Sequence, residues 1–155
     1  MIFAPTFALN TDINSAARTT LTMALCTIRS IDHLVLTVAN LSATVGFYEN
    51  LGMRYQRWSQ SGTSADSTPR HSLLFGSQKI NLHIQGHEVE PKAARVQTGS
   101  GDLCFIVAEP VQEISERLLS KGIAILEGGG VVRRTGAKGP IHSLYIRDPD
   151  GNLVE

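Results

Sequence analysis

The sequence predicts an α+β fold built from two βαβββ modules in tandem, which together form a cupped, partly open sheet with the helices outside. Two observations lead to this prediction. The order strand, helix, strand, strand, strand occurs twice, once in each half of the chain. The segment HLVLTVA at residues 33–39 also matches DLCFIVA at 102–108, and a helix that ends at a glycine follows in both, at Gly52 and Gly122.

The first module begins with an aliphatic strand and continues as a short helix. Residues 31–38 (IDHLVLTV) are rich in β-branched and aliphatic side chains, as is typical of a strand. Asn40 and Ser42 supply side chains that can cap a helix N-terminus, and the helix is expected to end at Gly52. Three further strands are expected at residues 53–58, 71–75 and 79–84, with a polar loop at 59–70.

The second module repeats this order of elements. Residues 102–107 predict a strand, and Pro110 opens a helix at a position where its missing N–H costs nothing. Ile114, Leu118 and Leu119 give this helix an apolar face. Further strands are expected at residues 123–126, 143–147 and 152–155, flexible segments at 128–130 and 133–139, and a turn at 148–151.

Residues 1–29 differ in composition from the rest of the chain. They contain a single acidic residue, Asp12, and no lysine or arginine precedes their apolar residues, which argues against a secretory signal. We expect an N-terminal arm, with a mitochondrial targeting segment as the alternative. Residues 30–155 are then expected to form one domain, with modules at about 30–90 and 100–155.

The composition of the chain excludes several classes of protein. Its 14 Lys and Arg residues balance 14 Asp and Glu residues, so no overall positive charge is available to hold nucleic acid or an anionic membrane. No apolar run approaches the roughly 20 residues that span a bilayer. The two cysteines, Cys26 and Cys104, are too few for a disulfide framework, which favours a reducing, cytoplasmic location.

Four polar side chains occupy comparable positions in the two modules. His33 lies near the start of the first strand and His83 in the last strand of the first module, and Asp102 and Glu155 hold the corresponding places in the second. Side chains on the first and last strands are expected to converge on the floor of the cup. Two imidazoles and two carboxylates suit a divalent ion such as Zn, Ni, Mn, Co or Fe(II). We therefore predict a metal site that leaves positions for water or substrate.

Each of these side chains also has a purely structural interpretation. A histidine in a strand is most often a hydrogen-bonded core or surface residue. Asp102 could begin its strand as a turn residue after Gly101, and Glu155 could be an exposed carboxylate. The metal hypothesis is favoured because all four residues fall at equivalent places in a repeated pattern.

Residues 133–139 (RRTGAKG) combine flexible glycines with three cations. Arg133, Arg134 and Lys138 could bind a carboxylate or phosphate of a substrate. A solvated hairpin loop is the alternative.

Three stretches of the chain resemble the vicinal oxygen chelate superfamily, which contains glyoxalase I, fosfomycin-resistance proteins, bleomycin-binding proteins and extradiol dioxygenases. They are IDHLVLTVANLSATVGFYENLGM, INLH and YIRDPDGNLVE. The segments FGSQKINLH, EPKAA, GSGDLCFI and RTGAKGPI are most similar to the glyoxalase-domain-containing-protein-5 type. The resemblance covers residues 31–155 and implies paired βαβββ modules that hold a metal through His33, His83, Asp102 and Glu155. Asp102 departs from the histidine or glutamine that glyoxalase I has at this position.

The resemblance implies a divalent-metal-dependent lyase or isomerase of glyoxalase type, acting on a small oxygenated substrate. The metal would chelate two neighbouring substrate oxygens and stabilise an enediolate, and Glu155 would act as the base that moves the proton. An Fe(II) extradiol dioxygenase is an alternative, with His33, His83 and Glu155 as its ligands and Asp102 behind them. A non-catalytic protein that binds a small ligand is a second alternative.

Members of this superfamily commonly form homodimers, and in glyoxalase I the site is shared between subunits. The resemblance therefore implies a homodimer, which would also cover open sheet edges. The expected partners are a small-molecule substrate and a second copy of the chain, with no nucleic acid and no membrane.

Overall fold

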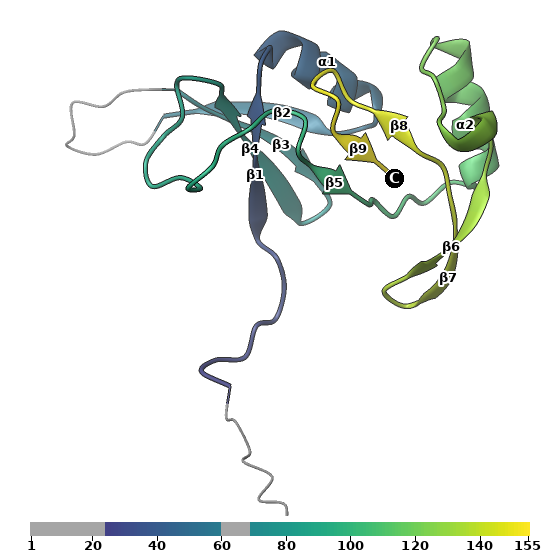
Figure 1. The fold of residues 1–155 in the computed structure, drawn as a ribbon, viewed down its shortest axis with the longest axis horizontal. Helices are drawn as coiled ribbons and strands as arrows, with labels where there is room; N and C mark the ends of the chain where they lie inside the picture. Colours follow the sequence, from purple (N-terminus) through teal and green to yellow (C-terminus); the bar gives the residue numbers. More distant parts are fainter. Residues whose placement is uncertain (1–23, 60–68) are drawn as a thin grey trace, which may run out of the picture. The chain divides into compact units, whose positions relative to one another are not determined.

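The computed structural model describes residues 24–59 and 69–155 (Figure 1). The chain divides into two units, residues 1–30 and 31–155, and the helices and strands described all belong to the second unit. Most of the predicted arm and most of the predicted polar loop lie outside the described residues. The second unit mixes helices with several sheets, which confirms the predicted α+β class. Among the described residues, no helix has the length and apolar character needed to cross a membrane.

The first module forms a four-stranded sheet in the order β1-β4-β3-β2. Its strands are β1 (His33–Val38), β2 (Arg54–Trp58), β3 (Arg70–Phe75) and β4 (Gln78–Ile84). Each strand lies within two residues of its predicted bounds. β1 and β4 run parallel, and the other neighbours are antiparallel.

Helix α1 (Leu41–Asn50) follows β1 and covers one face of this sheet (Figure 1). Asn40 caps its N-terminus, as predicted, because the Asn40 side chain accepts the Ala43 N–H at 3.0 Å. The opposite face of the sheet, here called the outer face, carries the odd-numbered residues of β1 and β4, since side chains alternate along a strand. His33, Asn81 and His83 therefore lie on the outer face.

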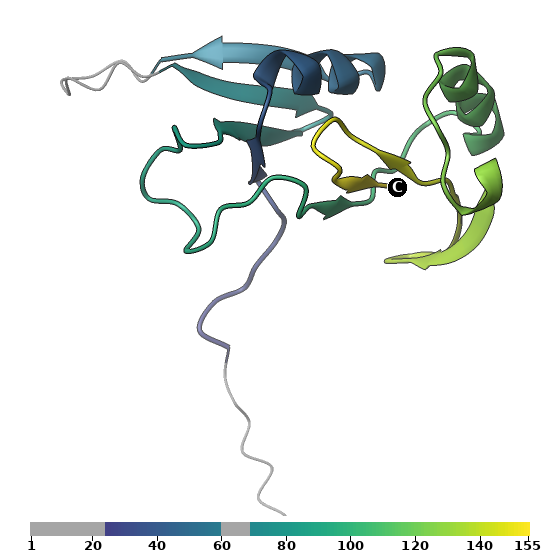
Figure 2. The ribbon, with the colours of Figure 1, turned by 45° about the horizontal axis from the view of Figure 1, so that its top comes forward.

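The strands of the second module fall into two separate sheets. A three-stranded sheet in the order β5-β9-β8 joins β5 (Asp102–Leu103), β8 (Ile146–Arg147) and β9 (Leu153–Val154). A hairpin joins β6 (Val132–Gly136) and β7 (Gly139–Ser143) into a separate two-stranded sheet, and Figure 2 shows this hairpin apart from β8 and β9. Helix α2 (Val111–Ser120) begins after Pro110, and a short 3₁₀ turn, η1 (Glu127–Gly129), precedes the hairpin.

Three predictions for this module are wrong. The strand expected at residues 102–107 has only two residues, because its last backbone bond to the neighbouring strand is made by the Phe105 N–H. Residues 123–126 form no strand. The Ile123 N–H donates to the Leu118 carbonyl at 3.0 Å, at the end of α2, and the Leu126 N–H donates to the Tyr145 carbonyl at 2.8 Å. The flexible segment expected at 133–139 lies mostly within the β6–β7 hairpin.

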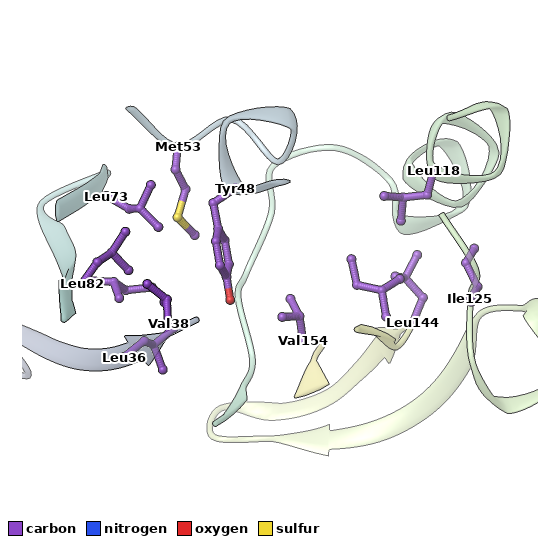
Figure 3. Close-up of a cluster of buried hydrophobic side chains, with 12 residues drawn as sticks. Leu36, Val38, Tyr48, Met53, Leu73, Leu82, Leu118, Ile125, Leu144 and Val154 are labelled. Atoms are coloured by element: carbon purple, nitrogen blue, oxygen red, sulfur yellow. The ribbon is translucent and has the colours of Figure 1, made fainter. Parts of the chain in front are cut away.

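Apolar side chains beneath the two helices form the core of the second unit. Tyr48 of α1 and Leu118 of α2 are both buried, and burial of such side chains is the main favourable term in folding. In Figure 3, Tyr48 and Val154 lie between two groups, one made of Leu36, Val38, Met53, Leu73 and Leu82 and the other of Leu118, Ile125 and Leu144.

A buried carboxylate joins the turn before β9 to helix α1. Asp148 accepts hydrogen bonds from the Tyr48 hydroxyl at 3.1 Å and from the Asn152 side-chain amide at 2.8 Å. Burial, together with the Asp148 carboxylate, raises the pKa of Tyr48 well above its usual range, so the phenol stays protonated and donates. Asp150 accepts the Ala39 N–H at 2.9 Å. These bonds place β9 beside the first module.

Candidate functional site

In both modules, the first and last strands lie side by side and parallel. β1 pairs with β4 in the first module, and β5 pairs with β9 in the second. The sequence-predicted ligands of each module therefore lie on adjacent strands, and the register of each pair decides which side chains can meet.

In the first module, the register separates His33 from His83. Lys79 lies opposite His33, and His83 lies opposite Thr37, four residues further along. At a rise of about 3.3 Å per residue, the two histidines are about 13 Å apart along the strands. One chain therefore does not bring their imidazoles to the same ion.

In the second module, the register brings Asp102 and Glu155 close together. Asp102 lies opposite Leu153, and Glu155 follows two residues later on the same face. The Glu155 N–H donates to the Leu103 carbonyl at 2.7 Å, which holds this last residue against β5. A spacing of two residues on adjacent strands puts the Cα atoms about 8 Å apart, within reach of a shared ligand.

The same geometry in the first module points to Asn81, which the sequence comparison did not select. Asn81 lies two residues beyond Lys79, the partner of His33, just as Glu155 lies two residues beyond the partner of Asp102. The register thus makes Asn81, rather than His83, the counterpart of Glu155. The Asn81 side-chain oxygen is buried and accepts no hydrogen bond from the described residues. A buried oxygen without a partner is costly, and a bound ion would satisfy it.

Asp32 orients the imidazole of His33. Its Oδ1 lies 2.7 Å from His33 Nδ1, and this hydrogen bond is the main cause that lowers the pKa of Asp32. The His33 side chain is 41% exposed, and the contact of Nδ1 with Asp32 leaves its second nitrogen, Nε2, for another partner. A carboxylate on one imidazole nitrogen is the usual support for a histidine that binds metal through the other.

His83 is half-buried and lies beside a cleft that also contains Asp102. Burial lowers the pKa of His83, and the positive charge of Arg70 lowers it further, so its imidazole is neutral near pH 7. The cleft has a volume of about 590 Å³ and is bounded by β1, by residues 91–97 and by the start of β5. His83 and Asp102 are thus brought together around a space large enough for a small molecule.

Glu155 lies against the thiol of Cys104. Burial raises the pKa of Cys104, and the Glu155 and Asp102 carboxylates raise it further. The thiol is therefore held protonated between two carboxylates, and these three side chains share one face of the β5–β9 pair.

The four predicted ligands do not form one cluster within a chain. Across residues 24–59 and 69–155, no three His, Cys, Asp or Glu side chains come close enough to hold a metal ion together. The structure instead presents two pairs, His33 with Asn81 and Asp102 with Glu155, one in each module.

The cations at residues 133–139 are used unequally. Arg134 pairs with the Glu127 carboxylate and donates to the Tyr145 hydroxyl at 3.1 Å, so its guanidinium is already engaged. Arg133 and Lys138 are exposed on the β6–β7 hairpin. Their role in binding a substrate stays a prediction.

The fold and the paired donors define a protein of two modules, each of which begins with a strand and a helix and presents two nitrogen or oxygen donors from, or directly after, its first and last strands. The chain belongs to the Glyoxalase/Bleomycin resistance protein/Dioxygenase superfamily, whose family model matches residues 30–155. This membership confirms the superfamily that the sequence resembles, which includes glyoxalases and dioxygenases.

Virulence protein STM3117 from Salmonella typhimurium is 52% identical over 126 residues, which cover 81% of each chain. The crystal structure of that protein superposes on this structure with a TM-score of 0.72, and the alignment covers 83% of this chain and 95% of that one. Glyoxalase domain-containing protein RDO1 from Mycosarcoma maydis is 47% identical over 83% of this chain and 67% of its own length.

A lactoylglutathione lyase from Agrobacterium tumefaciens, 20% identical, shares only the fold, with a TM-score of 0.57. The alignment covers 83% of this chain and 92% of the lyase.

Proposed function

We propose that this protein is a divalent-metal-dependent enzyme of glyoxalase type, a lyase or isomerase that acts on a small oxygenated substrate. The observation that supports this most is the repeated donor geometry. Each module carries one pair of nitrogen or oxygen donors, two residues apart in register, on its parallel first and last strands.

The side chains fit a divalent ion. His33 offers Nε2 because Asp32 occupies its other nitrogen, and Asn81 offers a buried oxygen that has no partner among the described residues. Asp102 and Glu155 add two carboxylates. A set of one imidazole and three oxygen donors suits Mn, Fe(II), Co, Ni or Zn. His83 remains a predicted ligand, and replacing Asn81 and His83 separately would show which of them binds.

A divalent ion at these residues would supply Lewis-acid polarisation of two neighbouring substrate oxygens. The chain's own contribution is to hold the donors rigidly. The buried Asp148 contacts fix β9, and the Leu103 and Phe105 backbone bonds fix Glu155 on that strand.

Glu155 is the residue that we assign to proton transfer. It is half-buried, its carboxylate lies against the exposed Cys104 thiol, and no ion pair among the described residues involves it. A carboxylate without a basic partner can accept a proton from carbon and return it to the neighbouring carbon.

We also propose that the two pairs meet across a homodimer. Each pair lies in a different sheet of the chain, and apolar side chains are exposed next to both. Val35, on the outer face beside His33, is 45% exposed, and Ile106, just beyond β5, is 83% exposed. A second copy would cover these side chains while it brings one pair to the other. The free cysteines suit the reducing cytoplasm as its location.

The alternative of an Fe(II) extradiol dioxygenase has less support. It needs His33 and His83 on one iron, and the register keeps them about 13 Å apart within a chain. A non-catalytic binding protein would not need Glu155 as a base, so the test below separates it.

The test is activity in a methylglyoxal–glutathione assay and a catechol assay, with each metal in turn. We expect isomerase activity in the first assay and a loss of at least about 10²-fold in kcat for Glu155→Gln, because this change removes one proposed metal ligand together with the general base, which alone contributes about 10²- to 10⁴-fold. The same change at Glu49, which is exposed on α1, is the control and should leave kcat unaltered. Full activity in Glu155→Gln would remove its assigned role, and ring cleavage in the second assay would favour the dioxygenase.

A further inference from the structure

The outer face of the first sheet is rich in positive charge. Cross-strand register aligns Arg54, Leu74, Lys79 and His33 in one row across β2, β3, β4 and β1. The four strands contain no aspartate or glutamate, and the nearest carboxylate along the chain is Asp32, which His33 binds. An anion that approaches this face therefore meets a favourable potential.

Lys79 is the cation of this row closest to the proposed metal donors. It lies directly opposite His33 and two residues before Asn81, and adjacent strands are separated by about 4.8 Å. Its side chain is half-buried, and among the described residues no ion pair involves it. The charge of Lys79 also lowers the pKa of Asp32, but by less than the hydrogen bond and the charge of His33 do.

Trp58 forms an aromatic wall beside this lysine. The Lys79 ammonium lies 5.7 Å from the centre of the indole ring, and the Arg70 guanidinium lies 5.8 Å from it. A cation–π contact is attractive but supplies no counter-charge, so it holds the lysine without neutralising its charge. The ammonium keeps donors for an oxyanion.

We propose that Lys79, with Trp58 beside it, binds an oxyanion of the substrate, and that the enzyme therefore selects small anionic molecules. That the bound anion is a substrate rests on the proposed function, whereas the anion site itself is inferred from Lys79 and Trp58 alone. The β6–β7 hairpin is the other candidate for an anion site, but its Arg134 already has carboxylate and hydroxyl partners. The oxyanion could be a carboxylate or a phosphoryl group, and the experiment includes a probe for each.

Trp58 is the only tryptophan in the chain, so its fluorescence reports on this site alone. The full chain, stripped of metal on a chelating resin, is titrated with inorganic phosphate and with acetate at constant ionic strength. We expect a saturable change with at least one probe. Equilibrium dialysis with labelled phosphate or acetate gives the same constant without relying on the indole.

The variants locate the site. Lys79→Met should weaken binding about tenfold or more, since a charge-assisted hydrogen bond is worth about 1.5–3 kcal/mol. Lys79→Arg should restore most of the affinity. Lys121→Met is the matched control, because that ammonium donates to Asn50 at 3.1 Å at the end of α1. Far-UV circular dichroism verifies that each variant is folded.

Two results would overturn the inference: no saturable binding of either probe, or Lys79→Met binding as tightly as the parent. A loss of binding in Arg133→Met instead would move the anion site to the hairpin. Because the titration needs neither metal nor turnover, anion binding can survive when metal binding and catalysis fail. The failure of the proposed function is thereby distinguished from the failure of this site.

Discussion

At the scale of single residues, His71 shows how burial sets a protonation state. Its Nδ1 lies 2.8 Å from the Tyr55 hydroxyl, and the two rings stack. Burial lowers the pKa of His71 below its ordinary value of 6.5, and the Arg57 charge lowers it further. The neutral ring can accept the Tyr55 hydrogen bond, whereas the protonated ring cannot.

This predicts a pH dependence of stability. The folded state takes up the His71 proton at a lower pH than the unfolded chain, so the unfolded chain binds more protons as the pH falls through 6.5. The free energy of unfolding should therefore fall between about pH 7 and pH 5, and His71→Gln should fall less steeply. Urea unfolding at several pH values measures both slopes, and parallel slopes would contradict the assignment.

The sequence pattern identifies some site residues and hides others. His33 is found because it follows an aspartate at the start of an aliphatic strand, and Asp102 because it holds the same place in the repeat. Asn81 is missed because alternation puts it on the same face as His83, two residues away, and the histidine is the more familiar ligand. Only the strand register, a long-range property, shows that Asn81 is the counterpart of Glu155.

At the scale of elements, two glycines with left-handed backbones differ in how closely other atoms approach them. Gly99, with a φ of 68°, precedes β5, and a Cβ there would lie 2.5 Å from the Asp150 carbonyl oxygen. Gly76, in the β3–β4 turn, has a φ of 50° and no atom within 4 Å of such a Cβ. Both resist a side chain through backbone strain, but only Gly99 is sterically closed.

We therefore predict that Gly99→Ala destabilises the protein more than Gly76→Ala does. The left-handed backbone alone costs about 1–2 kcal/mol in both variants. Forcing a methyl group against the Asp150 carbonyl should add about 1–3 kcal/mol. The free energies of unfolding in urea measure the difference, and equal losses would mean that the close approach is unimportant.

The two modules were not equally predictable. The four strands of the first module were anticipated closely because each has a full partner, and its helix was marked by the Asn40 cap. In the second module, apolar runs such as 104–107 and 123–126 have strand-like sequences but lack backbone partners for most of their length. A run of β-branched side chains indicates a preference for extended backbone, and pairing decides whether a strand forms.

At the scale of the whole molecule, the central claim is that two copies share each metal site. In the proposed dimer, one copy would contribute His33 and Asn81 to each site, and the other would contribute Asp102 and Glu155. Two observations support this claim. The two donor pairs are separate within a single chain, and the exposed side chains of Val35 and Ile106 lie beside them.

The most direct measurement is Mn(II) binding by equilibrium dialysis of His33→Ala and Glu155→Gln, first separately and then after the two variants are unfolded and refolded together. We predict that each variant alone loses Mn(II) binding. When the two variants assemble at random, half of the dimers are mixed. Each mixed dimer has one site that carries both changes and one site that carries neither, so the mixture should regain about a quarter of the parent's capacity. Undiminished binding by either variant alone, or a mixture that binds none, would contradict the account.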